Sequence, residues 1–158
     1  MPSVGSQAPA LIAETDQEPF DLSKKLGQNV VVYFYPKDMT PGCTTEAQNF
    51  RDAITEFTNC NTIIVGVSKD SCKRHAKFRE KNDLNFYLAS DEDGKICDDW
   101  GVWREKKNYG RTYMGIVRST FLIDSKGNVV EIWDNTRVKG HVDAVLASAK
   151  ALNQAASE

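Results

Sequence analysis

Cysteine and histidine are scarce in this sequence, and their arrangement excludes several kinds of site. No two cysteines form a C-x-x-C pair, and the histidines do not complete the spacing of a zinc site. Four reduced thiols in a cytosolic protein are read as reactive or packed residues rather than as a disulfide framework. We therefore expect no metal centre and no structural disulfides. The residues concerned are Cys43, Cys60, Cys72, Cys97, His75 and His141.

The sequence also lacks a long apolar run and an excess of charge of one sign. The longest aromatic and aliphatic run, residues 30–35, is far shorter than a membrane span. The 20 basic and 22 acidic residues nearly cancel, so no overall field favours nucleic acid, and the basic stretch 104–111 is interpreted as a solvated loop. Residues 1–10 have neither the charged nor the apolar segment of a secretory signal. We expect a cytoplasmic protein that binds neither membranes nor nucleic acid.

The apolar patterns predict one domain over residues 1–158, without repeats or linkers. A continuous apolar run suits a strand buried on both faces, and the helix and second apolar run that follow complete a βαβ unit. The expected elements are strand 30–35, helix 44–59, strand 63–67, a helix from 70 or 71 to 82, strand 86–88, a turn at 91–94 opening a helix through 100, a hairpin of 117–123 and 128–133, and a last helix along 142–152. This order predicts an α/β, thioredoxin-like fold with a central mixed β-sheet flanked by helices.

One cysteine stands at the turn between the first strand and the first helix. Thr40 suits the N-cap and Pro41 the first helical position, while Gly42 allows close approach to the backbone. Cys43 then falls in the first helical turn, where unpaired N–H groups and the helix dipole favour an anion. Such surroundings lower the pKa of a thiol, and the thiolate is the reactive form. Cys43 is therefore a candidate nucleophile, with a packed first-turn cysteine as the alternative.

A single charged residue interrupts the expected strand 116–123. Alternation places Arg118 on one face with Ile116, Thr120 and Leu122. Because an unpaired buried charge is very costly, this arginine must reach solvent or find an anion. An edge-strand position, a carboxylate such as Asp124, or a thiolate would each satisfy it.

The residues around Cys43 resemble a known family. Pro36, Thr40 and Cys43 stand in the P-x-x-x-T-x-x-C arrangement of the peroxiredoxins, and "YFYPKDMTPGCTTEAQNFRD" is similar to the bacterioferritin comigratory protein, or peroxiredoxin Q, branch. The similarity continues through "VGVSKDSCKRHAKF", "LASDEDGKICDDWGVW" and "RSTFLID", so it covers nearly the whole chain.

This resemblance implies a monomeric thiol peroxidase that reduces hydrogen peroxide and organic hydroperoxides without a metal or organic cofactor. Thioredoxin or a similar thiol would be the electron donor. Cys43 would be the peroxidatic cysteine. Thr40 and Arg118 would hold the peroxide oxygens and the thiolate, and Pro36 would shield the pocket from water.

The sequence departs from many members of this branch at the position of the resolving cysteine, where Gln48 stands. Cys60 lies 17 residues further along the same expected helix, roughly 25 Å away, which no disulfide spans. Cys97 is interpreted as a packed helix residue, and Cys72 as a candidate resolving thiol. We expect a one-cysteine mechanism with an external thiol reductant. The alternatives are a two-cysteine mechanism through Cys72, a thiol–disulfide oxidoreductase, and a non-enzymatic redox sensor or chaperone.

Overall fold

A strand that is buried along its whole length lies at the centre of the molecule. The structure is a computed structural model that describes residues 1–156. Strand β3 (Asn29–Phe34) pairs in parallel with β4 (Thr62–Ser68) and antiparallel with β8 (Ser119–Ile123). Its side chains alternate between two hydrophobic cores, one on each face of the sheet, which explains why the run carries no polar side.

Seven strands form the main sheet in the order β2-β1-β5-β4-β3-β8-β9. The three central strands β3, β4 and β5 (Tyr87–Ser90) are parallel, and the others join antiparallel. The remaining members are β1 (Ile12–Thr15), β2 (Phe20–Asp21) and β9 (Val129–Trp133). The expected mixed sheet, with its βαβ unit and its hairpin around residues 124–127, is confirmed.

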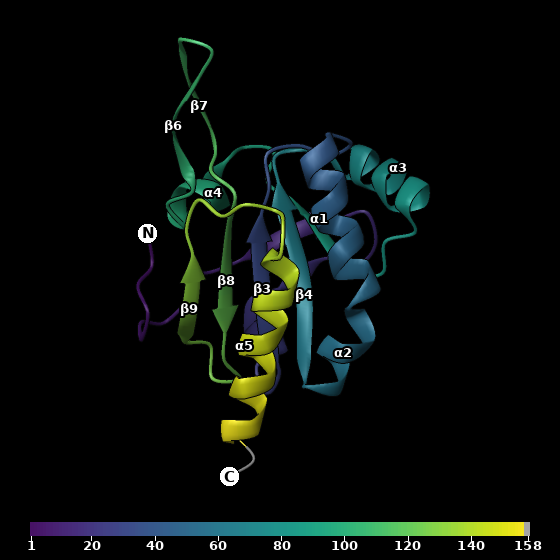
Figure 1. The fold of residues 1–158 in the computed structure, drawn as a ribbon, viewed down its shortest axis with the longest axis vertical. Coiled ribbons are helices and arrows are strands. Elements are labelled where there is room, and N and C mark those ends of the chain that lie inside the picture. The colour runs from purple at the N-terminus through teal and green to yellow at the C-terminus, as the bar shows by residue number, and fades with distance from the viewer. Residues whose placement is uncertain (157–158) are drawn as a thin grey trace.

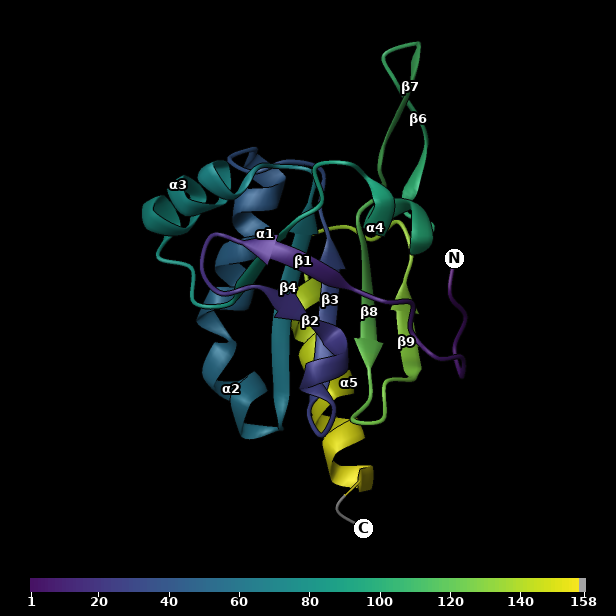
Figure 2. The ribbon, with the colours of Figure 1, turned by 180° about the vertical axis from the view of Figure 1, so that it is seen from behind.

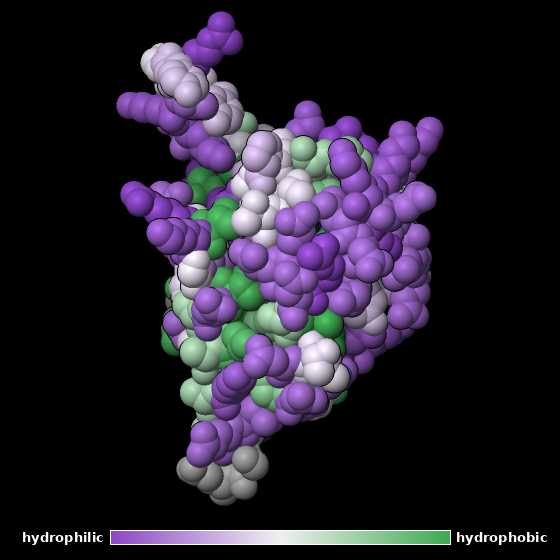
Figure 3. All heavy atoms as spheres, turned by 45° about the vertical axis from the view of Figure 1, so that its right-hand side comes forward, coloured by the Kyte–Doolittle hydropathy of each residue, from purple (hydrophilic) through white to green (hydrophobic). Residues whose placement is uncertain are grey.

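Helices cover both faces of this sheet (Figures 1 and 2). One face carries α1 (Pro41–Asp52), α2 (Ile54–Asn59), α3 (Cys72–Asn82) and α5 (His141–Ala156). The other carries α4 (Lys95–Asp99) and the short 3-10 helix η1 (Leu22–Lys25). Within residues 1–156, no helix has both the length and the apolar character to cross a bilayer. Hydrophilic residues cover most of the face seen in Figure 3, and hydrophobic ones form a narrow band.

Three expectations about the elements were wrong. The expected helix 44–59 begins earlier and is broken at Ala53, whose ψ of 2° leaves the helical path and separates α1 from α2. The basic stretch interpreted as a loop instead forms a two-stranded hairpin of β6 (Trp103–Asn108) and β7 (Arg111–Ile116), which projects from the body in Figure 1. Because this hairpin leaves the main sheet, the chain must turn before β8. Arg118 therefore lies in that turn rather than within a strand.

Candidate active site

The peroxiredoxin-like motif lies where β3 ends and α1 begins. Pro36 and Thr40 are half-buried in the connecting loop, and Pro41 is the first helical residue. Thr40 occupies the N-cap position, but its hydroxyl makes no cap bond and instead donates to the carbonyl of Lys37 at 2.8 Å. The expected N-cap position of Thr40 is confirmed.

Cys43 is almost completely buried, at 2% exposure, in the first turn of α1. The first backbone hydrogen bond of the helix is donated by Thr44 to Thr40 at 2.9 Å. The N–H of Cys43 therefore belongs to the group that has no acceptor within the helix, at the positive end of the helix dipole. A thiolate here lies among donors rather than in purely apolar surroundings.

Arg118 reaches the start of α1 from the turn between β7 and β8. Its Nη2 lies 3.4 Å from Cys43 Sγ, and its Nη1 donates to Glu46 Oε1 at 2.6 Å. A Cβ added at Gly42 would lie 3.3 Å from the same Nη2, so glycine leaves room for the guanidinium. The partners of this arginine are the Glu46 carboxyl group and the sulfur of Cys43. Pairing with Asp124 was the wrong alternative.

Glu46 was not singled out from the sequence, although it stands three residues after Cys43 on the same helix face. Its side chain is fully buried, and Oε2 has no hydrogen-bond partner. Burial raises the pKa of Glu46 to about 7, against the opposing effect of Arg118. The signal in the sequence was a carboxylate on the buried stripe of Cys43, Ala47 and Phe50.

Arg118 keeps its charge in this buried setting. Burial disfavours the guanidinium, but Glu46 and Cys43 outweigh that cost and raise the pKa of Arg118. His141 does not compete for Glu46, because burial and the nearby Arg118 lower its pKa to about 4. Its Nε2 lies 2.7 Å from Thr120 Oγ1 and 4.0 Å from Glu46 Oε2. At neutral pH, Arg118 rather than His141 is thus the cation beside Cys43 and Glu46.

A second cation, Lys106, lies near Arg118 and Cys43. Lys106 of β6 is half-buried and donates from Nζ to the carbonyl of Ile116 at 2.9 Å. Burial and the neighbouring Arg118 lower the pKa of Lys106, while Cys43 acts in the opposite direction. This contact was not predicted, because residues 104–111 were interpreted as a solvated loop.

The other three cysteines lie outside this cluster, and none of the four is in a disulfide. Cys60 is buried at the end of α2, where its Sγ lies 3.3 Å from the carbonyl of Phe57. Cys97 is fully buried, and burial together with Asp91 raises the pKa of its thiol, which fits the packed interpretation. Cys72 is half-exposed at the start of α3. Burial also raises the pKa of Cys72, partly offset by the Ser90 hydroxyl.

Gln48, at the position of the usual resolving cysteine, joins two helices. Its Nε2 donates to Asn82 Oδ1 at 3.1 Å, which links the middle of α1 to the end of α3. The position of the usual resolving cysteine thus carries a side chain that makes a hydrogen bond between two helices.

Comparisons with known proteins agree with this geometry. Residues 4–132 match the AhpC/TSA family. The chain is 46% identical to "Peroxiredoxin Bcp" of Bacillus subtilis (strain 168) over 152 residues, covering 96% of this chain and 97% of the relative. It is 43% identical to "Peroxiredoxin Bcp" of Escherichia coli (strain K12) over 135 residues, covering 85% and 86%.

Solved structures give the same result. A bacterioferritin comigratory protein of Xanthomonas campestris, described for its alkyl peroxide reduction activity, superposes with a TM-score of 0.87 at 39% identity, covering 96% of this chain and 99% of that one. Peroxiredoxin Q of the same organism superposes with a TM-score of 0.84 at 42% identity, covering 92% and 91%. The chain belongs to the AhpC/TSA family and, within it, to the Bcp and peroxiredoxin Q group of thiol peroxidases.

Proposed function

We propose that Cys43 is the peroxidatic cysteine of this thiol peroxidase and that Arg118 activates it. The observation that carries the proposal is the 3.4 Å contact between Arg118 Nη2 and the buried Cys43 Sγ at the start of α1. Cys60 Sγ instead lies against the carbonyl of Phe57, and burial raises the pKa values of the Cys72 and Cys97 thiols.

Ionisation alone does not make a thiol into a peroxidase. A thiol with a pKa of about 8.5 is only ~3% ionised at pH 7, and lowering the pKa to ~6 raises that fraction roughly 30-fold. Intrinsic nucleophilicity falls at the same time by roughly 13-fold at a Brønsted slope of about 0.45. The net gain is about twofold. The remaining acceleration must come from groups that stabilise the transition state.

Arg118 is placed to supply that stabilisation. The Cys43 thiolate attacks one peroxide oxygen, so that an S–O bond forms as the O–O bond breaks and the electron pair leaves with the departing oxygen. That oxygen gathers negative charge and takes up a proton to become water or an alcohol. A forked guanidinium beside Sγ can donate to both oxygens as this charge develops. The product on Cys43 is a sulfenic acid.

Thr40 and Pro36 complete the proposed pocket. The Thr40 hydroxyl proton is directed to the Lys37 carbonyl, which leaves the hydroxyl oxygen free to accept a hydrogen bond from the peroxide O–H. Pro36 has no N–H and is half-buried next to Tyr35, and we assign it to shielding the reacting oxygens from water.

We further propose that the enzyme uses one cysteine. Gln48 stands at the usual resolving position and is bonded to α3, so an external thiol of the thioredoxin type would reduce the sulfenic acid directly. One reductant thiol forms a mixed disulfide with Cys43 and releases water. A second thiol then attacks the reductant sulfur of this mixed disulfide, which releases Cys43 as a thiol and leaves the reductant oxidised to a disulfide. The substrates would be hydrogen peroxide and organic hydroperoxides, as the alkyl peroxide activity of the Xanthomonas campestris relative suggests. We place this chain in the cytoplasm as a monomer.

Intact-mass analysis after one equivalent of peroxide tests both proposals, with Cys43→Ser as the control. We expect the parent to gain one oxygen on Cys43, and two oxygens with excess peroxide, because a sulfenic acid without a resolving partner is oxidised further. Cys43→Ser should gain none and consume no peroxide. Turnover by Cys43→Ser would contradict the peroxidatic assignment, whereas loss of two hydrogens mapped to a Cys43–Cys72 bridge would establish the two-cysteine alternative.

A further inference from the structure

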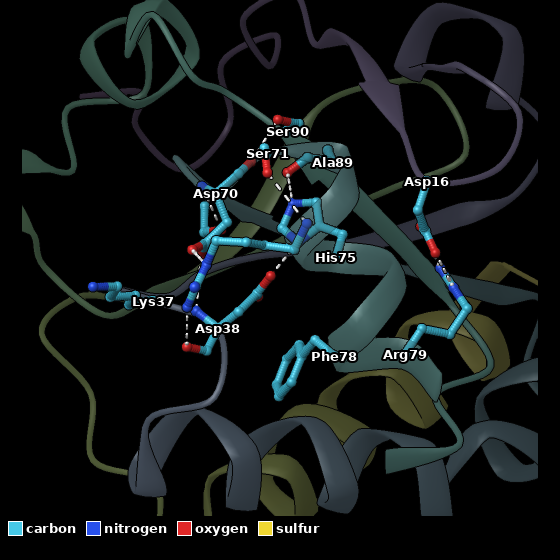
Figure 4. A network of polar contacts seen from close by, with 12 residues as sticks. Asp16, Lys37, Asp38, Asp70, Ser71, His75, Phe78, Arg79, Ala89 and Ser90 are labelled. Atoms are coloured by element: carbon cyan, nitrogen blue, oxygen red, sulfur yellow. Dashed lines mark hydrogen bonds and ion pairs between the residues drawn. The ribbon is translucent and has the colours of Figure 1, made fainter. Parts of the chain in front are cut away.

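A second ion pair, fully buried and separate from the Cys43 cluster, joins the loop before α1 to helix α3. His75 Nδ1 lies 2.7 Å from Asp38 Oδ2, and both side chains have no exposed surface. Figure 4 shows the two side chains pointing toward each other, one from the loop and one from the helix. Asp38 stands two residues before Thr40 and five before Cys43. The loop that carries the proposed peroxide-binding residue is therefore attached to a different element.

The hydrogen-bond partners define the charges of this pair. His75 Nε2 lies 3.0 Å from the carbonyl oxygen of Ala89 in β5, which can only accept. Asp38 Oδ1 accepts from the hydroxyl of Tyr35 at 2.6 Å, at the end of β3. Because both ring nitrogens face oxygen atoms that can accept, these contacts suit a ring that carries a hydrogen on each nitrogen. The arrangement is that of an imidazolium paired with a carboxylate.

The groups around His75 agree with that charge. Burial acts against the imidazolium, but Asp38, the Ala89 carbonyl and Asp70 outweigh it and raise the pKa of His75. Next to Asp70 lies Arg74 of α3, which donates from Nε to Asp70 Oδ1 at 2.9 Å and is half-exposed. Asp70 itself precedes α3 and accepts from the Ser68 hydroxyl at 2.7 Å.

The backbone of Asp38 is held by the same network. Its N–H donates to Asp70 Oδ2 at 2.8 Å, and its carbonyl accepts from Arg74 Nη2 at 3.3 Å. The next residue, Met39, has φ of 68°, in the left-handed region that is unfavourable for a residue with a long side chain. Such a conformation persists only when its surroundings impose it. Here the residue with the imposed conformation, Met39, is followed directly by Thr40 and the first turn of α1.

We propose that the Asp38–His75 ion pair is a positioning element of the peroxidase site, which holds the loop 36–40 in the shape that places Thr40 and Cys43 for reaction. Neither residue touches the reacting atoms, and the pair acts through the loop. The proposal rests on the proposed role of Cys43. It makes the rate of Cys43 oxidation depend on a histidine that lies on α3.

The same helix offers a matched control. One turn after His75, Arg79 forms two hydrogen bonds with Asp16, at 2.6 and 3.0 Å, and the side chain of this aspartate is 3% exposed. Figure 4 shows this pair at the other end of the network, where it ties α3 to the segment after β1 and not to the loop 36–40. Asp16→Asn thus removes a comparable buried charge pair from α3 without changing any contact of Asp38.

The test compares Asp38→Asn, His75→Asn, the double variant and Asp16→Asn by stopped-flow measurement of Cys43 oxidation with hydrogen peroxide, under conditions where each variant is shown to be folded. We expect Asp38→Asn and His75→Asn to slow oxidation by about tenfold or more, because small misplacements of reacting groups cost this much. The double variant should be no slower than the worse single variant, and Asp16→Asn should remain within about twofold of the parent.

A pH profile separates positioning by charge from a general structural role. Once the pH exceeds the raised pKa of His75, the imidazolium loses its proton, so the ratio of the parent rate constant to that of His75→Asn should fall toward one. Equal slowing by Asp16→Asn, rate constants within about threefold of the parent, or a ratio independent of pH would each overturn the proposal. A parent that consumes peroxide without oxidising Cys43 would instead contradict the proposed function.

Discussion

Arg118 holds two acidic groups of one helix at the same time, and this determines what its removal does. The guanidinium donates to Glu46 at 2.6 Å and lies 3.4 Å from Cys43 Sγ. A change at Arg118 therefore affects the stability of a buried carboxylate as well as the reactivity of the thiol. Any test of its role must separate these two effects.

We predict that Arg118→Met slows the reaction of Cys43 with peroxide by about 10²–10³, the cost of losing one donor to a developing oxyanion. The variant also leaves Glu46 buried without its partner, which costs about 3–5 kcal/mol of stability if the carboxylate stays charged. The double variant Glu46→Gln/Arg118→Met should recover much of that stability and none of the rate. Stopped-flow kinetics and urea unfolding measure the two effects separately. A rate within about threefold of the parent would show that Arg118 has only a structural role.

Replacing Lys106 should have a smaller effect on the rate of Cys43 oxidation, and the neighbouring Lys107 offers a control. Its charge interacts with Arg118 and Cys43 and is half-buried, whereas Lys107 on the same strand is exposed. Removing a partly exposed cation near the thiolate costs up to about 1 kcal/mol. Lys106→Met should therefore slow Cys43 oxidation about two- to fivefold at low salt, and less at high salt. Lys107→Met should leave the rate unchanged at both salt concentrations, and equal effects of the two variants would refute a specific role for Lys106.

At the scale of elements, the parts with a regular apolar pattern were predictable. Strands β3 and β4 and helix α5 were found from their buried runs and stripes, because burial on a defined face leaves a periodic signal. The β6–β7 hairpin was missed because it stands away from the body and most of its residues are exposed, so no apolar alternation marks it. The break at Ala53 was missed because alanine is a strong helix former. Strands β1 and β2 are too short to leave a pattern.

The residues of the site likewise fall into those that local sequence signals predict and those that they do not. Cys43 and Thr40 were predictable because the signals of a helix start are local in sequence. The contact of Arg118 with Glu46 was not predictable, since Glu46 lies 72 residues away and looks like any helical glutamate. Asp38 and His75, 37 residues apart, are joined only by the packing of α3 against the sheet.

The packing of β4 against the helices gives a prediction at this scale. An added Cβ at Gly66 would lie 2.8 Å from Tyr33 Cζ, and this ring is fully buried and stacked on Phe50 with centroids 4.5 Å apart. Because the ring cannot move aside, Gly66→Ala should destabilise the protein by about 1–3 kcal/mol in urea unfolding. In Gly115→Ala of β7 the nearest atom is Cδ of the flexible Lys106 side chain, at 3.1 Å, so this control should change stability by no more than about 0.5 kcal/mol. A neutral Gly66→Ala would show that the core is looser than these contacts imply.

At the scale of the whole molecule, two buried groups give opposite pH dependences to folding. His141 has its pKa lowered from 6.5 to about 4, first by burial and then by Arg118. Its contribution to stability is present above pH 6.5 and is lost as pH falls to about 4, because the unfolded chain then binds a proton that the folded one does not. Glu46 has its pKa raised from 4.5 to about 7 by burial. Its contribution is present below pH 4.5 and is lost as pH rises to about 7.

Each group contributes at most about 3.4 kcal/mol at 1.36 kcal/mol per pKa unit, so the two slopes nearly cancel where their windows overlap. We predict that replacing either group exposes the slope of the other. Between about pH 4.5 and 6.5, the stability of His141→Asn should fall as pH rises, relative to the parent, and that of Glu46→Gln should rise. Urea unfolding at several pH values measures both differences, and the remaining groups titrate alike in all three proteins. Parallel curves for the parent and both variants would contradict the prediction, because they would mean that neither buried group changes its proton affinity on folding.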